Sequence, residues 1–490
     1  MTRVSDILTE HALADLFRTI GKVADELSIP TYIVGGFVRD LFLHRDTTDI
    51  DFVTVGSGTG LKLAKAVSSA LGGVGVHEYE QFGTAAIRAN IAGYESAVQI
   101  EFVAARKESY RKASRKPIVD DGTLIEDLSR RDFTINAMAI QLNEEHYGEL
   151  IDEFGGMQDL NRGVLRTPVD PDVTYTDDPL RAIRAARFAA QLGFTISAES
   201  ISAMTRNAER ISIVSPERII EEIQRIMATT RPSRGLKVLY ETGILKIVFP
   251  ALADLGGIDT VDGRKHKDNF YHTLEVVDNL VDRLGDRDPA ETIWLRWAAL
   301  LHDIGKPRSK KYDRTSGWTF HGHEEIGARM VPKIFRSLRL PTDERLKYVQ
   351  KMIRLHHRPV SLVDEHVTDS AVRRLLFDAA DDIDDLMTLV KADITSKNDS
   401  RRRRYLKAFE EVEQKLIEVE EKDRLRNFQP PVDGNEIMQS LGIPPGRLVG
   451  ILKKAVREAI LDGSIPNEHD AAFEYLMQVK EDVIRESQDV

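Results

Sequence analysis

The sequence contains no cysteine, and this absence excludes two classes of structure at once. A chain without thiols forms no disulfide framework and no zinc site built from thiolates, and it fits a reducing compartment. The N-terminal residues lack the apolar core of a signal peptide. The apolar run WLRWAALL is interrupted by Arg296 and is too short to cross a bilayer. We therefore expect a cytoplasmic protein without a membrane segment.

The sequence also lacks an excess of positive charge. Its formal net charge is −11, from 68 basic and 79 acidic residues, so any RNA contact must use local basic surfaces. Two basic runs stand out, at residues 106–117 and at the four consecutive arginines 401–404. Most runs of charge are solvated faces or loops. The first run lies between two motifs described below, which favours a functional role; the second fits either interpretation.

The length and pattern of the chain predict an α+β protein of several domains. Its 490 residues are 42% hydrophobic and 30% charged, which is typical of a globular chain. Residues 1–28 have helical spacing, residues 31–55 predict strand, turn–helix and strand, and residues 84–103 predict a hairpin. Beyond residue 155 strand signals fade, and we expect helices almost to the C-terminus.

The strongest functional pattern is the stretch YIVGGFVRDLFLHRDTTDIDFVT at residues 32–54. Side chains alternate faces along a strand, so Asp49 and Asp51 should project together into solvent while Ile50 and Phe52 are buried. Paired carboxylates repel each other, and a hard divalent cation relieves that repulsion. Two such ions can activate an attacking hydroxyl and stabilise a leaving pyrophosphate.

A D-x-D pair alone is more typical of the polar face of an amphipathic strand. Here a Gly35-Gly36 turn precedes it, and two glycines allow the backbone to approach a ligand closely. Arg39 follows the turn and can form a fork to phosphate oxygens. These residues favour a metal-dependent nucleotide site.

This pattern resembles the class II tRNA CCA-adding enzymes and the bacterial poly(A) polymerases. The resemblance continues in order through SRRDFTINAM at 129–138 and DDPLRAIRAARF at 177–188. It implies a nucleotidyltransferase head with a mixed β-sheet over residues 1–160, followed by an all-α neck over 161–260 that binds the nucleotide base and RNA. An HD body over 261–400 and a C-terminal helical, tRNA-binding tail over 401–490 complete the expected order.

The same resemblance implies roles for individual residues of the head and neck. Asp49 and Asp51 would hold catalytic Mg²⁺, with Glu101 as the third carboxylate, although a single Glu on a strand is usually just exposed. The expected nucleotide contacts are Gly35, Gly36, Arg39, Arg131, Asp132, Asp178, Arg181, Arg184 and Arg187. Among these, Arg131 and Asp132 would meet the ribose and phosphates.

Asp178 and Arg181 would pair with the Watson–Crick edge of C or A. Asp178-Pro179 is also a favoured helix start, so Asp178 has a plain alternative as an N-cap. Arg181, Arg184 and Arg187 are spaced by three, and we expect their side of the helix to stay out of the core, because three unpaired buried arginines would be costly.

A second set of metal-binding residue types follows at 272–393. His272, His302-Asp303 and Asp393 occur in the H…HD…D order of the HD phosphohydrolase superfamily. The resemblance implies that these four residues hold one divalent ion (Mg²⁺, Mn²⁺ or Ni²⁺) with a bound water as nucleophile. His323 and either His356 or His357 would complete a second site. Such a site would hydrolyse phosphomonoesters or 2′,3′-cyclic phosphates, but an HD domain can also persist as a scaffold.

The leading hypothesis is a nucleotidyltransferase that adds or repairs the 3′-terminal CCA of tRNA with CTP and ATP. A poly(A) polymerase shares the head motifs; the HD body and the 23 residues between Arg106 and Arg130, long enough for a C-to-A switching loop, favour CCA addition. A hydrolase whose head only binds nucleotide would be favoured by loss of Asp49 or Asp51, and both are present. A non-enzymatic RNA-binding module fits least. The sequence leaves oligomeric state and tRNA preference open.

Overall fold

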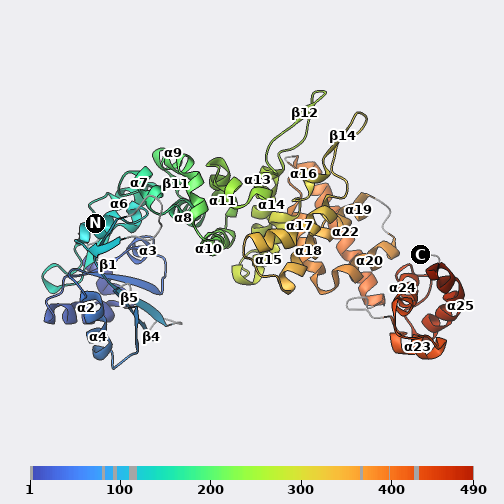
Figure 1. The fold of residues 1–490 in the computed structure, drawn as a ribbon, viewed down its shortest axis with the longest axis horizontal. Helices are drawn as coiled ribbons and strands as arrows, with labels where there is room; N and C mark the ends of the chain where they lie inside the picture. The colour runs from blue at the N-terminus through green and yellow to red at the C-terminus, as the bar shows by residue number, and fades with distance from the viewer. Residues whose placement is uncertain are drawn as a thin grey trace. The chain divides into compact units, whose positions relative to one another are not determined.

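The computed structural model describes residues 4–79, 83–91, 97–109, 118–364, 368–396, 398–423 and 430–488. It divides into two compact units, residues 1–249 and 250–490 (Figure 1). A mixed sheet occupies the N-terminal part and helices dominate the rest, which confirms the predicted α+β class. Most of the basic run at 106–117 lies outside the described residues, from 110 onward. The predicted four-part division stays a prediction.

The head is built on one seven-stranded sheet with the order β3-β4-β5-β2-β1-β8-β9. Strand β2 runs antiparallel to β1 and parallel to β5, and the other neighbours are antiparallel. The predicted hairpin at 84–103 is therefore the β4–β5 pair. The strands are β1 (Thr31–Val34), β2 (Asp49–Thr54), β3 (Val76–Tyr79), β4 (Thr84–Ala89), β5 (Val98–Ala104), β8 (Ala139–Gln141) and β9 (Leu150–Ile151), with a separate ladder of β6 (Arg106–Ser109) and β7 (Ile118–Asp121).

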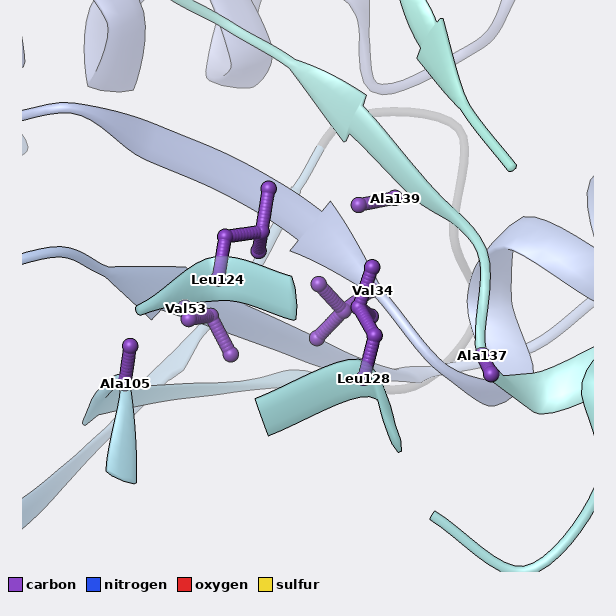
Figure 2. Packing of buried hydrophobic residues seen from close by; sticks show 7 residues of the cluster. All are labelled: Val34, Val53, Ala105, Leu124, Leu128, Ala137 and Ala139. Carbon is purple, nitrogen blue, oxygen red and sulfur yellow. The ribbon is translucent and has the colours of Figure 1, made fainter. Parts of the chain in front are cut away.

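Short helices connect and cover these strands: α1 (Val4–Glu10), α2 (Ala14–Glu26), α3 (Gly36–Phe42), α4 (Thr59–Ala70), α5 (Leu124–Ser129) and α6 (Gly156–Arg162). Figure 2 shows the small aliphatic core where α5 packs on the sheet, with Leu124 and Leu128 against Val34, Val53 and Ala139. Helix α4 packs closely on β5 at Gly60, where an added Cβ atom would lie 2.9 Å from the backbone nitrogen of Ala104. These contacts fix the two strands that carry the acidic residues.

The rest of the first unit is helical apart from a parallel pair of two-residue strands, β10 (Val164–Leu165) and β11 (Thr195–Ile196). Its helices are α7 (Pro171–Asp177), α8 (Leu180–Leu192), α9 (Ala198–Arg206), α10 (Pro216–Met227), α11 (Pro232–Glu241) and α12 (Ile244–Val248). Helix α8 packs against α10 and α11 and is apolar along most of its length. Pro216 and Pro232 each stand at the start of a helix, where a missing N–H costs nothing.

The second unit contains α13 (Pro250–Ala253), α14 (Asn269–Leu284), α15 (Pro289–Leu301), α16 (Lys306–Ser309), α17 (His323–Ser337), α18 (Glu344–Leu355), α19 (Arg358–Asp364), α20 (Asp369–Ala379), α21 (Ile383–Ala392), α22 (Asp399–Asp423), α23 (Gly434–Leu441), α24 (Arg447–Leu461) and α25 (His469–Gln488). Two hairpins that the sequence pattern missed interrupt the helices. They are β12 (Thr260–Val261) with β13 (Arg264–Lys265), and β14 (Lys311–Asp313) with β15 (Gly317–Thr319). Among the described residues, no helix has the length and apolar character needed to span a membrane.

Candidate active site and metal cluster

Three acidic side chains come together on two neighbouring strands of the head. Ile50 and Phe52 are fully buried, as the alternation along β2 predicted. Asp49 is exposed, but Asp51 is only partly so, and the expectation that both project fully into solvent is wrong for Asp51. In the parallel β2–β5 pair, Asp51 is in register with Glu101. The carboxylates thus lie on one face of two neighbouring inner strands of the sheet.

The electrostatics of this group suit a bound cation. Burial raises the pKa of the Asp51 carboxyl, and the negative charges of Glu101 and Asp49 raise it further, while the guanidinium of Arg131 opposes them. Glu101 accepts a hydrogen bond from Gln99 Nε2 at 2.9 Å. Because the candidate metal-ligand atoms are all carboxylate oxygens, a hard ion such as Mg²⁺ fits their chemistry. A cation here would remove the mutual repulsion of the acids.

The glycine turn approaches the same place. Gly35 has a φ of +76°, and a Cβ atom there would lie 2.8 Å from Arg131 Nη1 and 3.4 Å from Asp51 Oδ2. Both the backbone conformation and the space therefore require glycine. Gly36 begins helix α3 directly after this turn.

Arg39, one turn into α3, is held by protein groups on both sides of its fork. Its Nε and Nη2 donate to Asp40 at 2.9 and 2.6 Å, and its Nη1 donates to Asn136 Oδ1 at 2.8 Å. The side chain is almost fully buried. The fork expected to bind phosphate is therefore in place, but a phosphate group must exchange for one of these partners.

Asp132 joins the sheet to helix α8. Its Oδ1 accepts from the backbone N–H of Phe133 and from Asn136 Nδ2, both at 2.9 Å. Its Oδ2 accepts from Arg184 Nε at 2.9 Å and Nη2 at 2.6 Å. Burial raises the pKa of Asp132, but the charge of Arg184 together with the hydrogen bonds from Asn136 and Arg184 outweighs burial and lowers the pKa to about 2. Both oxygens are thus engaged by the protein itself.

The arginines of α8 are not all on the solvent side. Arg187 is buried, which contradicts the expectation that this side stays out of the core. Its Nε lies 2.7 Å from the carboxylate of the buried Glu222 on α10, and its guanidinium lies 4.0 Å from the ring centre of Phe188. Burial lowers the pKa of Arg187 to about 10, and the charge of Glu222 partly opposes this. The carboxylate of Glu222, on another helix, offsets the cost of burying the charge of Arg187. The sequence argument had assumed that a buried arginine here would have no partner.

Asp178 has two partners at the start of α8. Its Oδ1 accepts from the backbone N–H of Leu180 at 3.1 Å, in accordance with a capping role, and its Oδ2 accepts from Arg218 at 3.2 Å. By contrast, Arg181 has no hydrogen-bond or ion-pair partner among the residues described by the structure. Its guanidinium is free to donate to a ligand.

These residues line one open cleft of about 480 Å³ within the first unit. Of the predicted head and neck residues, the cleft brings together Gly35, Gly36, Arg39, Asp49, Asp51, Arg131, Asp132, Asp178, Arg181, Arg184 and Arg187. Glu101 lies beside Asp51 but does not line it. The lining residues that the sequence argument missed include Asp40, Asn136 and Arg218. The first two stand inside the quoted motifs and could have been found, whereas Arg218 gives no local signal.

The second set of metal-binding residue types, at 272–393, forms a compact cluster at the ends of helices in the second unit. Two groups of side chains are close enough to share an ion: His272, His302 and Asp393, and Asp303, His323 and His356. Asp303 lies between them. Its Oδ2 is 3.2 Å from His302 Nε2 and its Oδ1 is 3.4 Å from His323 Nε2. His357 is exposed and belongs to neither group.

Hydrogen bonds orient the imidazoles for ligation. The Nδ1 atoms of His302, His323 and His356 lie 2.8, 2.9 and 2.7 Å from the backbone carbonyl oxygens of Ala299, Phe320 and Ile353. A carbonyl only accepts, so each Nδ1 carries the hydrogen, and the neutral form of each ring offers its Nε2 lone pair to a metal, as at many metal centres. The residues present therefore fit a divalent ion on either side of Asp303.

The charges within this cluster are strongly coupled. Burial lowers the pKa of His302, but Asp303 and Asp393 outweigh burial and raise it to about 10. Burial also lowers the pKa of His356 to about 3, and the charge of His302 adds to that effect. Lys306 Nζ contacts Asp303 Oδ2 at 2.6 Å. Lys306 and His302 therefore lie where their positive charges oppose those of the two carboxylates.

Three family models match the chain in order. They are the Poly A polymerase head domain at residues 31–166, the probable RNA and SrmB-binding site of polymerase A at 193–255, and the HD domain at 269–386. The A-adding tRNA nucleotidyltransferase of Deinococcus radiodurans is 31% identical over 90% of this chain and 93% of its own. The Multifunctional CCA protein of Pseudomonas paraeruginosa is 34% identical over 64% of this chain and 71% of its own.

Solved structures extend the similarity to the fold. The Thermotoga maritima CCA-adding enzyme complexed with tRNA has a TM-score of 0.62 at 22% identity, covering 98% of this chain and 99% of that one. A tRNA nucleotidyltransferase complexed with a primer tRNA and an incoming ATP analog has a TM-score of 0.54 at 26% identity, covering 81% and 99%.

Proposed function

This chain belongs to the family of tRNA nucleotidyltransferases that includes the A-adding and CCA-adding enzymes, and we propose that it adds or repairs the 3′-terminal CCA of tRNA with CTP and ATP. The observation that carries the proposal is the single cleft shared by the acidic pair, the glycine turn and the start of α8. A tRNA substrate also supports the proposal of a cytoplasmic location.

The reaction joins the 3′ oxygen of the tRNA to the α-phosphorus of the triphosphate and breaks the bond to the leaving pyrophosphate; the proton of the hydroxyl passes to solvent or a nearby base. Asp49, Asp51 and Glu101 would hold Mg²⁺, which when bound supplies charge stabilisation to the attacking and leaving oxygens. The Gly35-Gly36 turn allows the triphosphate to approach the backbone. Arg39 would bind phosphate oxygens once its fork is released from Asp40.

Base selection would use Asp178 and Arg181. A carboxylate only accepts hydrogen bonds, so Asp178 matches the amino group of C or A and not the carbonyl oxygen that U and G present there. The Arg181 side chain has no hydrogen-bond or ion-pair partner among the described residues, and a guanidinium only donates. Asp132 and Arg184 would act mainly by holding the α8 helix at the sheet, since their polar atoms already bond each other. The protein thereby selects C and A without a nucleic-acid template.

For the second unit we propose a metal-dependent phosphohydrolase. His272, His302 and Asp393 would hold one ion and Asp303, His323 and His356 a second, and an ion bound there would supply Lewis-acid activation. Mixed imidazole and carboxylate ligands suit Mn²⁺ or Ni²⁺ as well as Mg²⁺. Lys306 is placed to bind a phosphate oxygen when it leaves Asp303.

The deciding experiment offers the protein three RNAs: a tRNA lacking CCA, a tRNA ending in CC, and an unstructured RNA. Each is incubated with CTP, ATP or both. CCA addition predicts extension of both tRNAs and little of the unstructured RNA. Extension by A alone, and only of the CC-ended tRNA, would replace the proposal with an A-adding activity. Long A tracts on every RNA would establish a poly(A) polymerase.

A further inference from the structure

The aromatic ring of Phe188 on α8 is surrounded by positive charge. The Cζ atoms of Arg187, Arg39 and Arg184 lie 4.0, 5.0 and 5.6 Å from its ring centre. Phe188 lines the cleft, but only 3% of the residue is exposed, which leaves no ring face on which a nucleotide base could stack. The ring therefore faces protein cations, and a guanidinium within about 6 Å of a ring centre is attracted to the ring.

The three arginines differ in what else holds them. Arg184 and Arg187 each form an ion pair with a buried carboxylate of the protein. The acidic partner of Arg39 is Asp40, which is only partly buried. This carboxylate is the group that a phosphate must replace when Arg39 binds the triphosphate. Arg39 is thus the arginine that loses its acidic partner during the reaction.

Two of the contacts described for the Arg39 side chain can persist through this exchange. Its Nη1 donates to Asn136 Oδ1 at 2.8 Å, and its guanidinium lies against Phe188. Asn136 also donates to Asp132, which binds Arg184, and Arg184 contacts the same ring. A cation–π contact acts through the charge of the guanidinium, so the N–H groups of Arg39 stay available for oxygen acceptors.

We propose that Phe188 is a positioning residue of the nucleotide transfer: its ring holds the Arg39 guanidinium in place while that guanidinium exchanges Asp40 for phosphate oxygens of the incoming triphosphate. The inference rests on the nucleotide transfer proposed above. The plain alternative is that Phe188 only fills the space between α8 and the sheet. The two roles differ in their consequences, because a space-filling ring affects stability, whereas a positioning ring affects the binding of phosphate.

The first test separates KM from kcat. Phe188→Leu should raise KM for CTP and ATP roughly 10-fold with kcat nearly unchanged, because the phosphate contact is made equally in the ground state and the transition state. Phe188→Tyr keeps the ring and should retain the wild-type KM. The matched control is Phe17→Leu, which removes a fully buried ring of the same unit that contacts Phe37 and Phe52. Melting temperatures of the three variants check the fold.

The second test needs no tRNA and no turnover. Radiolabelled CTP is bound at equilibrium with Mg²⁺ and displaced by tripolyphosphate, which has a phosphate chain but neither ribose nor base. Phe188→Leu should weaken both compounds roughly 10-fold, and Phe17→Leu should weaken neither. Arg39→Ala should weaken both as well. The double variant Arg39→Ala/Phe188→Leu should bind no more weakly than Arg39→Ala alone, because the ring then has no phosphate-binding group to hold.

The outcomes separate the two proposals. If the wild type adds no nucleotide to any tRNA, the transferase fails, and the binding measurements alone decide the role of Phe188. That role is overturned if Phe188→Leu resembles Phe17→Leu, if Phe188→Tyr is as impaired as Phe188→Leu, or if tripolyphosphate displacement stays unchanged. Further loss of affinity in the double variant would also overturn it. Phe188→Met takes the same tests if Phe188→Leu does not fold.

Discussion

The cleft of the first unit and the metal cluster of the second unit differ in their exposure to solvent and in the types of side chain that could bind a metal. The cleft is open, its candidate metal ligands are carboxylates, and arginines line its walls. The cluster is nearly closed, and imidazoles outnumber its carboxylates. An open, arginine-lined cleft suits a large polyanion that must enter and leave. A closed set of nitrogen and oxygen ligands suits tightly held ions that meet only a small part of a substrate.

The two sites also differ in how the chain supplies their residues. The three acids proposed to hold Mg²⁺, Asp49, Asp51 and Glu101, lie on strands β2 and β5, whose packing is carried by other, apolar side chains. The ligands of the cluster stand at the ends of α15, α18 and α21 and within the first turns of α14 and α17. Removing an acid from the cleft should therefore cost catalysis, whereas removing a cluster ligand should cost both catalysis and stability.

The largest expected effect is in the cleft. Asp49→Ala or Asp51→Ala should lower nucleotide addition to tRNA on the order of 1,000-fold or more, because each removes a ligand of the ions that stabilise the transition state. Hydrolysis by the second unit should continue at the wild-type rate. Radiolabelled CMP and AMP incorporation measures the first and release of nucleoside monophosphate the second. Undiminished addition in either variant would remove these residues from the metal site.

Substitutions of ligands in the metal cluster should impair hydrolysis by the second unit and leave nucleotide addition by the first unit intact. His302→Ala or Asp303→Ala should reduce hydrolysis of 2′,3′-cyclic nucleotides by about 100-fold or more and leave CCA addition largely intact. Both should also lower the melting temperature, because one buried charge loses its partners. His357→Ala is the control, since this neighbouring histidine is exposed and outside both ligand groups. If folded variants lose CCA addition, the cluster serves the transferase itself.

Among the acidic residues that line the cleft, we expect Asp132 to stabilise the fold. The pKa of Asp132 is depressed to about 2 in the folded state against an ordinary 3.8, so its ionised form stabilises the fold above about pH 4. The advantage of the wild type over Asp132→Asn should be roughly 2 kcal/mol near neutral pH and should decline as pH falls from 4 towards 2. Urea unfolding of both proteins between pH 3 and pH 7 checks this. An advantage that is constant across that range would contradict the ion pair with Arg184.

The smallest expected effect concerns fidelity. Arg181→Ala should raise misincorporation of UMP and GMP relative to CMP and AMP by roughly 10-fold, because one bidentate contact to a base edge is lost. Binding of the triphosphate should weaken less. Asp178→Asn keeps an oxygen for the backbone N–H of Leu180, so unchanged fidelity in that variant would assign Asp178 to capping alone. Sequencing of the added nucleotides distinguishes these cases.

Local pattern was enough to predict the β1–α3–β2 arrangement and the burial of Ile50 and Phe52. It was insufficient wherever a partner came from far along the chain. Burial of Arg187 depends on Glu222, which sits in an ordinary amphipathic helix. Likewise, only the folded chain decides between His356 and His357, because neighbouring histidines at a helix end differ in direction and not in sequence signal.

The two small hairpins of the second unit escaped prediction for a related reason. Their strands are two or three residues long, too short for an alternating pattern to appear. Their stability comes from side-chain contacts across separate segments, among them Tyr312 Oη with Asp262 Oδ2 at 3.2 Å. Register and pairing of such short strands are properties of tertiary structure.

Gly60 gives the head an unexpected point of mutational sensitivity. A methyl group there would stand 2.9 Å from Ala104 N and 3.0 Å from the carbonyl carbon of Val103, both backbone atoms of β5 that cannot rotate away. Any side chain at position 60 would have to push that strand, and Glu101 would move with it relative to Asp51. A deep mutational scan should therefore score Gly60 close to the acidic residues themselves, although Gly60 does not line the cleft.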